Sequence, residues 1–189
     1  MNARNVSILT AALLAFSVSA RADEYSDTVN LFKNAGESAA FYHNAFGYAV
    51  FPTIGKGGVG VGGAYGKGRV YEKGKYVGDT SMTQVTVGLQ LGGQAYSEMI
   101  FFEDERAFRE FTGGNFEFSA DAGAVAITAA ANASASTTGS SAGASGGKKD
   151  AKTVGKYYKG MATFTIAKGG LMYEASIGGQ KFSYKAIGK

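Results

Sequence analysis

Residues 45–68 read AFGYAVFPTIGKGGVGVGGAYGKG, and this stretch decides the fold class of the chain. Its first part, Tyr48–Ile54, is a short apolar run that contains Pro52, the only proline of the sequence. Because proline cannot donate to a β ladder, this run predicts a strand that lies at a sheet edge or starts there. The second part, Gly57–Gly68, is rich in glycine, with Val59 and Val61 alternating with glycines, which leaves one strand face almost bare. A neighbouring backbone, helix or acyl chain can approach such a face closely.

The two-residue period continues beyond this stretch. Arg69–Tyr76 predicts a hairpin that turns at Lys73-Gly74. Thr83–Gly92 is the clearest strand, and Gln94–Phe102 is its expected antiparallel partner across a Gly92-Gly93 turn. Further strands are expected at residues 116–127, 162–166, 171–177 and 182–184, the last three forming a meander that turns at Gly169-Gly170 and Gly178-Gly179.

Two segments depart from this period and predict helices. Tyr25–His43 has apolar residues at helical spacing and is expected to form two pieces, with Gly36 as the break. Glu103–Thr112 has acidic residues in its first turn, where the helix dipole favours them, and Gly113 follows its end. The predicted fold is therefore α+β and mainly β. It is a strongly twisted antiparallel sheet or a small closed barrel, with an N-terminal helical segment and one inserted helix.

Residues 1–22 have the pattern of a secretory signal peptide. Arg4 supplies the positive start, and Val6–Val18 is too short an apolar run to span a bilayer, which needs about 20 residues. Ala20-Arg21-Ala22 is an A-x-A cleavage site. The sequence therefore predicts export to the periplasm or cell envelope, including a position peripheral to the outer membrane. Residues 23–189 would form a single mature domain.

Composition limits the functions that this domain can have. The sequence has no cysteine, which excludes disulfides, and His43 is its only histidine, which argues against a transition-metal cluster. The formal charge of +4 falls by two when Arg4 and Arg21 leave with the signal, so nucleic acid is not an expected partner. Residues 132–152 are mostly Ala, Ser, Thr and Gly, and are expected to form a mobile loop.

No catalytic constellation is recognisable. The G-x-G-x-x-G pattern at Gly58–Gly63 is followed by a predicted hairpin, whereas a dinucleotide site needs a helix there. The adjacent carboxylates of Glu103, Asp104 and Glu105 are interpreted as an electrostatic helix cap. The protein is predicted not to be an enzyme and to use no cofactor or metal.

Two patterns are candidates for a lipid-binding surface. The first lies on the N-terminal helical segment, where an apolar face either packs on the core or meets a membrane. The second is a basic group on the predicted hairpin, interleaved with tyrosines, which either binds anionic headgroups or keeps a strand edge soluble. The residues of the first pattern are Val29, Phe32, Lys33, Phe41 and Tyr42, and those of the second are Lys56, Lys67, Arg69, Lys73 and Lys75.

The opening stretch resembles the signature of the SYLF domain, in which A-x-G-x-x-V-F-P precedes K-G-G-x-G-x-G-G. The matching residues are Gly47, Val50, Phe51, Pro52, Lys56, Gly57, Gly58, Gly60, Gly62 and Gly63. A later stretch, AKGGLMYEASIGGQKFSY at residues 167–184, is similar to the family pattern K-G-L-x-x-G-x-x-x-x-G. It matches at Lys168, Gly169, Gly170, Leu171, Gly178 and Gly179, with Ala175 where glycine is usual.

This resemblance covers most of the mature chain and implies a non-catalytic lipid-binding domain. It also implies that eukaryotic relatives associate with phosphoinositide membranes, and some with actin, whereas bacterial relatives are exported envelope proteins. The predicted function is therefore binding of lipid or a membrane surface in the cell envelope. Anionic phospholipid is the expected partner, with another envelope protein as a further candidate. The alternatives are an outer-membrane β-barrel and an envelope protein-interaction module.

Overall fold

The structure, a computed structural model, describes residues 24–88, 93–119, 122, 124–127, 157–168 and 177–188. The expected signal peptide, the low-complexity loop and the segment from Gly169 to Leu171 lie outside these ranges, as does most of the expected strand 171–177. Within the described ranges, every helix is too short or too polar to cross a membrane.

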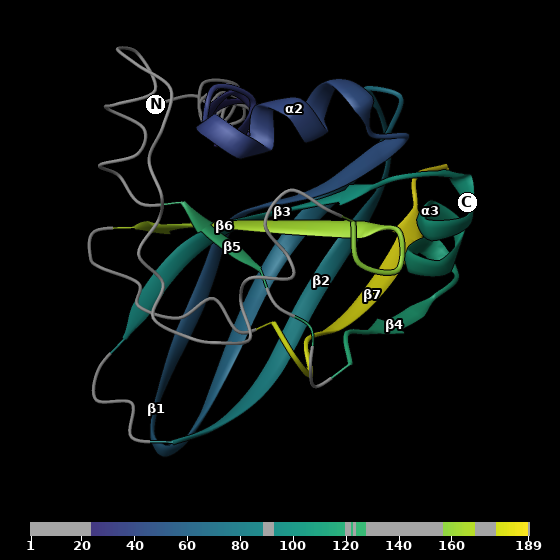
Figure 1. The fold of residues 1–189 in the computed structure, drawn as a ribbon. Coiled ribbons are helices and arrows are strands. Elements are labelled where there is room, and N and C mark those ends of the chain that lie inside the picture. The colour runs from purple at the N-terminus through teal and green to yellow at the C-terminus, as the bar shows by residue number, and fades with distance from the viewer. Residues whose placement is uncertain are drawn as a thin grey trace, which may run out of the picture.

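A seven-stranded sheet in the order β4-β7-β2-β1-β3-β6-β5 forms the body of the molecule (Figure 1). Neighbouring strands are antiparallel, except that β5 runs parallel to β6. This confirms the mainly β class, and in the described part of the chain the sheet stays open, with β4 and β5 at its edges. The strands are β1 (Gly47–Glu72), β2 (Lys75–Gly88), β3 (Gln94–Phe102), β4 (Asn115–Glu117), β5 (Val125–Ile127), β6 (Met161–Lys168) and β7 (Lys181–Ala186).

The long strand β1 doubles back on itself. Its first half pairs with β3 from Gly47 to Lys56, and its second half pairs with β2 from Gly60 onward. The two halves lie side by side, because a Cβ added at Gly68 would be 2.8 Å from the carbonyl oxygen of Val50. The reversal passes through Gly58 and Gly60, whose φ angles of 150° and 74° are ones that side chains disfavour.

Pro52 lies in the middle of the sheet, so the prediction of an edge strand or strand start was wrong. It falls where the register between β1 and β3 shifts, between Phe51 and Ile54. At such a bulge the ladder does not need the missing N–H of proline. The carbonyl oxygen of Pro52 accepts a hydrogen bond from Ser97 Oγ at 2.7 Å.

Two predicted strand arrangements were also wrong. β3 does not pair with β2, because both halves of β1 lie between them. The expected strand 116–127 is two short strands at opposite edges, β4 beside β7 and β5 beside β6. The middle strand of the expected meander, residues 171–177, lies mostly outside the described residues, so the meander stays a prediction; in the described sheet β6 lies between β3 and β5, and β7 between β2 and β4. Alternating hydrophobicity indicates which face a residue occupies, whereas the neighbour is chosen by long-range packing.

The N-terminal helices confirm the expected two pieces. Residues 24–33 form the first, a turn occupies residues 34–35, and α2 (Gly36–Asn44) follows. They cover one face of the sheet, where Phe32 packs in a core cluster with Phe101 of β3 and Phe164 of β6. The helical face therefore serves as core, as one of the two alternatives proposed.

A larger core fills the opposite face and is bounded by α3 (Glu105–Thr112), which confirms the inserted helix. Phe108 and Phe111 of α3 are buried there. The hairpin between β1 and β2 turns at Lys73 and Gly74 as predicted, with φ angles of 48° and 79°. Positive φ at both positions is typical of the type I′ turn, whose twist suits antiparallel strands.

Candidate lipid-facing surface

The second half of β1 and the paired part of β2 are neighbouring strands within the sheet, and this pair, which we call the ribbon, extends away from α2 and α3 (Figure 1). Side chains alternate across it. Ala64 on β1 and Met82 on β2 point inward and are buried, whereas their odd-numbered neighbours point outward. One outer face therefore collects residues from both strands, which we call the ribbon face: Val61, Tyr65, Lys67 and Val85. Val59 lies next to this face, in the reversal of β1 between Gly58 and Gly60.

The ribbon face and the reversal next to it expose an unusual amount of apolar surface. Val59, Val61 and Val85 are 78%, 66% and 78% exposed, and Tyr65 is 51% exposed. Gly63 faces Val85 directly across the ladder, so it adds no side chain that could cover the valine. Covering a valine fully is worth about 1.5–3 kcal/mol, so grouped exposed valines favour association with another apolar surface.

The predicted basic group is spread along the ribbon. Lys67 is exposed on the ribbon face and Lys56 lies just before the reversal of β1. Lys73 and Lys75 are at the opposite end, in and after the type I′ turn, and the Lys73 ammonium lies 5.0 Å from the ring centre of Phe46.

Arg69 is half-buried between these ends. Its guanidinium lies 4.3 Å from the ring centre of Tyr25 and 4.9 Å from that of Tyr76. Tyr76 also donates its hydroxyl proton to Asp79 at 2.7 Å, and burial together with this carboxylate raises the pKa of Tyr76 to about 12. Arg69 therefore fastens the first helix to the ribbon through cation–π contacts, and is less available to a headgroup than Lys67.

The helical candidates are mostly committed to the core. Phe32 is fully buried, and Val29 packs against the same cluster. Phe41 is surrounded by the rings of Phe101, Tyr157 and Phe164, with centroid distances of 6.1, 5.0 and 5.1 Å.

The remaining helical candidates lie near the start of β1. Tyr42 packs on Tyr48 at 5.5 Å, and the exposed Lys33 lies 5.3 Å from the ring centre of Tyr42. Burial and the neighbouring Tyr42 phenol raise the pKa of Tyr48. Among the described helices, Leu31 is the large apolar side chain that stays exposed.

The valines of the ribbon face were missed as site residues. The signal was present, since valine alternates with glycine at residues 57–63 and Val85 begins an alternating run. From the sequence alone, the two patterns belong to separate strands with no known register between them. The two patterns share one face because Gly63 of β1 pairs with Val85 of β2. This register between the strands is set by the tertiary fold.

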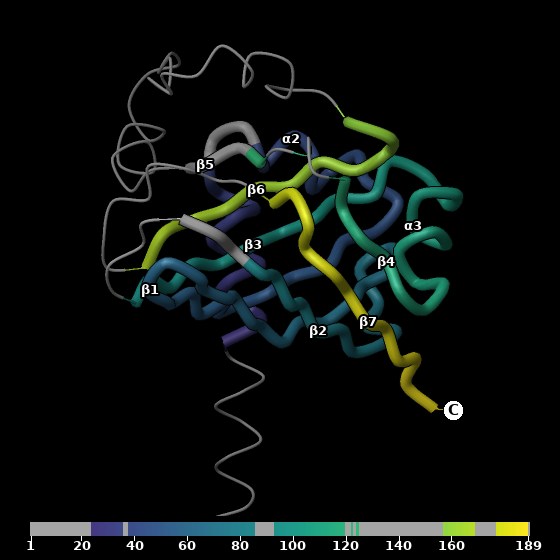
Figure 2. Tube along the Cα trace, turned by 90° about the horizontal axis from the view of Figure 1, so that it is seen from below, coloured from purple at the N-terminus to yellow at the C-terminus, as the bar shows by residue number. Residues whose placement is uncertain are grey.

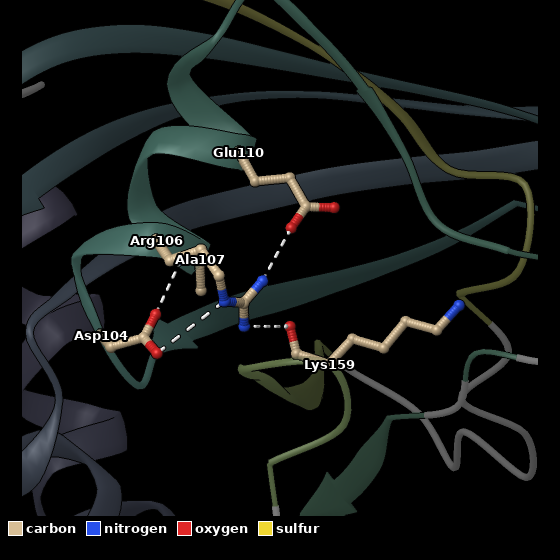
Figure 3. A network of polar contacts seen from close by, with 5 residues as sticks. All are labelled: Asp104, Arg106, Ala107, Glu110 and Lys159. Atoms are coloured by element: carbon tan, nitrogen blue, oxygen red, sulfur yellow. Dashed lines mark hydrogen bonds and ion pairs between the residues drawn. The ribbon is translucent and has the colours of Figure 1, made fainter.

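Asp104, the middle residue of the acidic run at residues 103–105, has a structural role (Figure 3). Asp104 is the N-cap of α3, and its side chain accepts a hydrogen bond from the N–H of Ala107 at 2.8 Å. Arg106 contacts Asp104 and Glu110 at 3.9 and 3.2 Å and donates to the carbonyl oxygen of Lys159 at 3.4 Å. These exposed pairs stabilise the helix start and join it to the turn before β6.

His43 is exposed in the last turn of α2, with its ring against that of Tyr42. Within the described ranges, no group of three or more histidines, aspartates or glutamates is placed to hold a metal ion.

Two comparisons relate the chain to known proteins. A family model described as "Las17-binding protein actin regulator", Ysc84, matches residues 83–185. A relative from Aeromonas veronii named Beta cell expansion factor A is 28% identical over 165 residues, which is 82% of this chain and 51% of the relative. The chain thus spans about half the length of that curated relative. Together these matches confirm the resemblance to the SYLF domain.

Proposed function

The chain belongs to the Ysc84 (SYLF) family, and from this premise we propose that the mature protein is a non-enzymatic module that binds lipid or a membrane surface in the cell envelope through the ribbon face. The observation that carries the proposal is the joint exposure of Val61 and Val85 on the ribbon face, with the exposed Val59 at the adjoining reversal of β1. Lys67 on that face and Lys56 near its tip suit an anionic phospholipid.

Energetics favour reversible, peripheral binding. Each valine contributes at most about 1.5–3 kcal/mol on full burial, and each lysine near an anionic surface about 1 kcal/mol. Part of this gain in free energy is offset by the loss of translational and rotational freedom on association. We therefore expect an affinity that depends on anionic lipid and falls as salt is added.

The ribbon face is a better candidate than the N-terminal helices. Phe32 and Phe41 would have to leave aromatic neighbours in the core before they could enter a bilayer. Removing a phenylalanine from a core costs about 3–5 kcal/mol, which is more than an exposed side chain gains on insertion. The ribbon valines need no such rearrangement, because they are already exposed.

Flotation with vesicles tests the proposal. The protein is purified from the envelope fraction, where its intact mass should correspond to cleavage after Ala22. The folded protein should float with vesicles of phosphatidylglycerol and phosphatidylcholine, and less with phosphatidylcholine alone. Replacing Val61 and Val85 by Asp should reduce the floated fraction at least about tenfold, the ratio that about 1.4 kcal/mol produces.

Ile187→Asp is the matched control, because Ile187 is also an exposed apolar residue (47%) but lies beyond β7. This variant should float like the wild type. If the folded wild type floats with neither vesicle, membrane-surface binding is wrong. Mass spectrometry of co-purified lipid would then separate an enclosed-lipid carrier from a protein-binding module.

A further inference from the structure

A polar cluster lies inside the curl of the sheet. Glu98 of β3 and Gln180 are fully buried, and Tyr96 is nearly so. Gln180 donates its amide hydrogens to Glu98 Oε2 at 3.0 Å and to the Tyr96 hydroxyl oxygen at 3.3 Å. Buried carboxyl groups are rare unless they are paired, so the protonation state of Glu98 depends on its few hydrogen-bond partners.

The contact joins two strands that are far apart in the sheet. Gln180 precedes β7, and β2 and β1 lie between β7 and β3. The sheet curls so that the start of β7 approaches β3 (Figure 2). Residues 177–180 are held over the interior by Gln84, whose amide donates to the carbonyl oxygen of Gly178 at 2.9 Å, and by backbone hydrogen bonds to Phe118.

The hydrogen-bond partners of Glu98 and Gln180 indicate that the Glu98 carboxyl group is protonated. Glu98 Oε1 and Gln180 Oε1 are both buried and have no partner among the described residues. If Glu98 were ionised, both atoms would be acceptors without a donor, and the charge would lack a basic partner in the described ion pairs. A carboxylic acid proton supplies the missing donor.

The side chains that surround Glu98 are almost all uncharged. Its cross-strand neighbours are Phe51 on β1 and Thr165 on β6. Gln180 faces it from the segment before β7, and Tyr96 lies on its own strand. Of these four side chains only the Tyr96 phenol titrates, and burial together with Glu98 raises its pKa far above the neutral range.

We propose that Glu98 is held as a neutral carboxylic acid paired with Gln180, and that this pair is a proton-dependent latch between β3 and the start of β7. Loss of the proton leaves a buried charge and loosens the latch. Burial raises the pKa of Glu98 to about 7, while the amide of Gln180 opposes the rise. The latch is therefore closed in mild acid and opens as the pH rises through the neutral range, independently of lipid binding.

Thermal unfolding of the wild type and Glu98→Gln at several pH values tests the latch. The melting temperature of the wild type should fall by roughly 5–10 °C between about pH 5 and pH 9. Glu98→Gln should show a much smaller fall, because a glutamine amide replaces the carboxylic acid as a neutral donor to Gln180. Parallel curves for the two proteins, or a variant less stable than the wild type at about pH 9, would overturn the proposal.

A second measurement follows the latch itself. Because the sequence has no cysteine, two cysteines introduced at the exposed Gln94 and Lys185 can carry spin labels on β3 and β7. The distance distribution between the labels should broaden as pH rises in the wild-type background and stay constant with Glu98→Gln. A distribution independent of pH in both backgrounds would show that deprotonation does not release β3 from β7.

Discussion

At the residue scale, the glycines of the opening stretch have different roles. Gly58 and Gly60 supply positive φ at the reversal of β1. Gly66 and Gly68 instead provide space, because Ile54 and Phe51 occupy the positions where their side chains would be. The bare strand face predicted from the sequence is therefore covered by the chain's own first half-strand.

Gly68→Ala should destabilise the fold by about 1–3 kcal/mol, the usual cost of overpacking a core. The added Cβ would lie 2.7 Å from the Phe51 ring and 2.8 Å from the carbonyl oxygen of Val50, and the backbone atom cannot easily move. Gly55→Ala is the control, since a Cβ there meets nothing within 4 Å. Urea unfolding of both variants measures the effect, and an equal loss at the two positions would contradict the close packing.

The pH effect of Glu98 also belongs to the residue scale, and its sign follows from the raised pKa. Between the ordinary value of 4.5 and about 7, the unfolded chain has lost this proton while the folded chain keeps it. Stability from this group is therefore complete below about pH 4.5 and decreases as pH rises to about 7. The contribution of this group to the free energy of unfolding is on the order of 3 kcal/mol, because its pKa differs between the folded and the unfolded chain.

At the element scale, α3 shows how a short helix is held in place. Its eight residues leave unsatisfied N–H groups at the start, and Asp104 accepts a hydrogen bond from one of them. Its inner side buries Phe108 and Phe111, and Phe111 contacts Phe102 and Phe182 with centroid distances of 5.0 and 5.1 Å. Cap and packing together place the helix at the end of the larger core.

Asp104→Ala should lower the free energy of unfolding by about 1 kcal/mol, because it removes the cap. Glu103→Ala removes the adjacent carboxylate without removing the cap, so it should change stability by less than about 0.5 kcal/mol. Asp104→Asn should retain most of the stability, since asparagine is also a good cap. Chemical unfolding of the three variants distinguishes capping from a general effect of negative charge, which would make all three alike.

At the scale of the whole molecule, the two ends of the ribbon differ. One end carries the reversal of β1 with exposed valines and Lys56, and Lys67 lies on the ribbon face between the two ends. The other carries the type I′ turn with Lys73 and Lys75, close to the first strand residues and α3. A membrane that docks on the ribbon face meets the first end.

Two double variants with the same change in charge test this orientation. Lys56→Ala with Lys67→Ala should weaken flotation with anionic vesicles at low salt, with a smaller effect at physiological salt, because exposed charges are screened within about 8 Å. Lys73→Ala with Lys75→Ala should have little effect at either salt concentration. Equal losses would indicate attraction by net charge alone and would contradict docking through the ribbon face.

The sequence by itself determined the mainly β class, the two-piece N-terminal helix, the Lys73-Gly74 turn, the α3 helix and the family. These features depend on local period, turn chemistry and capping, which neighbouring residues specify. Only the tertiary structure decided that β1 doubles back between β2 and β3, and that Phe32 is core while Val61 and Val85 share an exposed face. It also brought Gln180 to Glu98 across the sheet. Strand neighbours and burial depend on contacts between residues distant in the chain, and alternating hydrophobicity does not encode which strands meet.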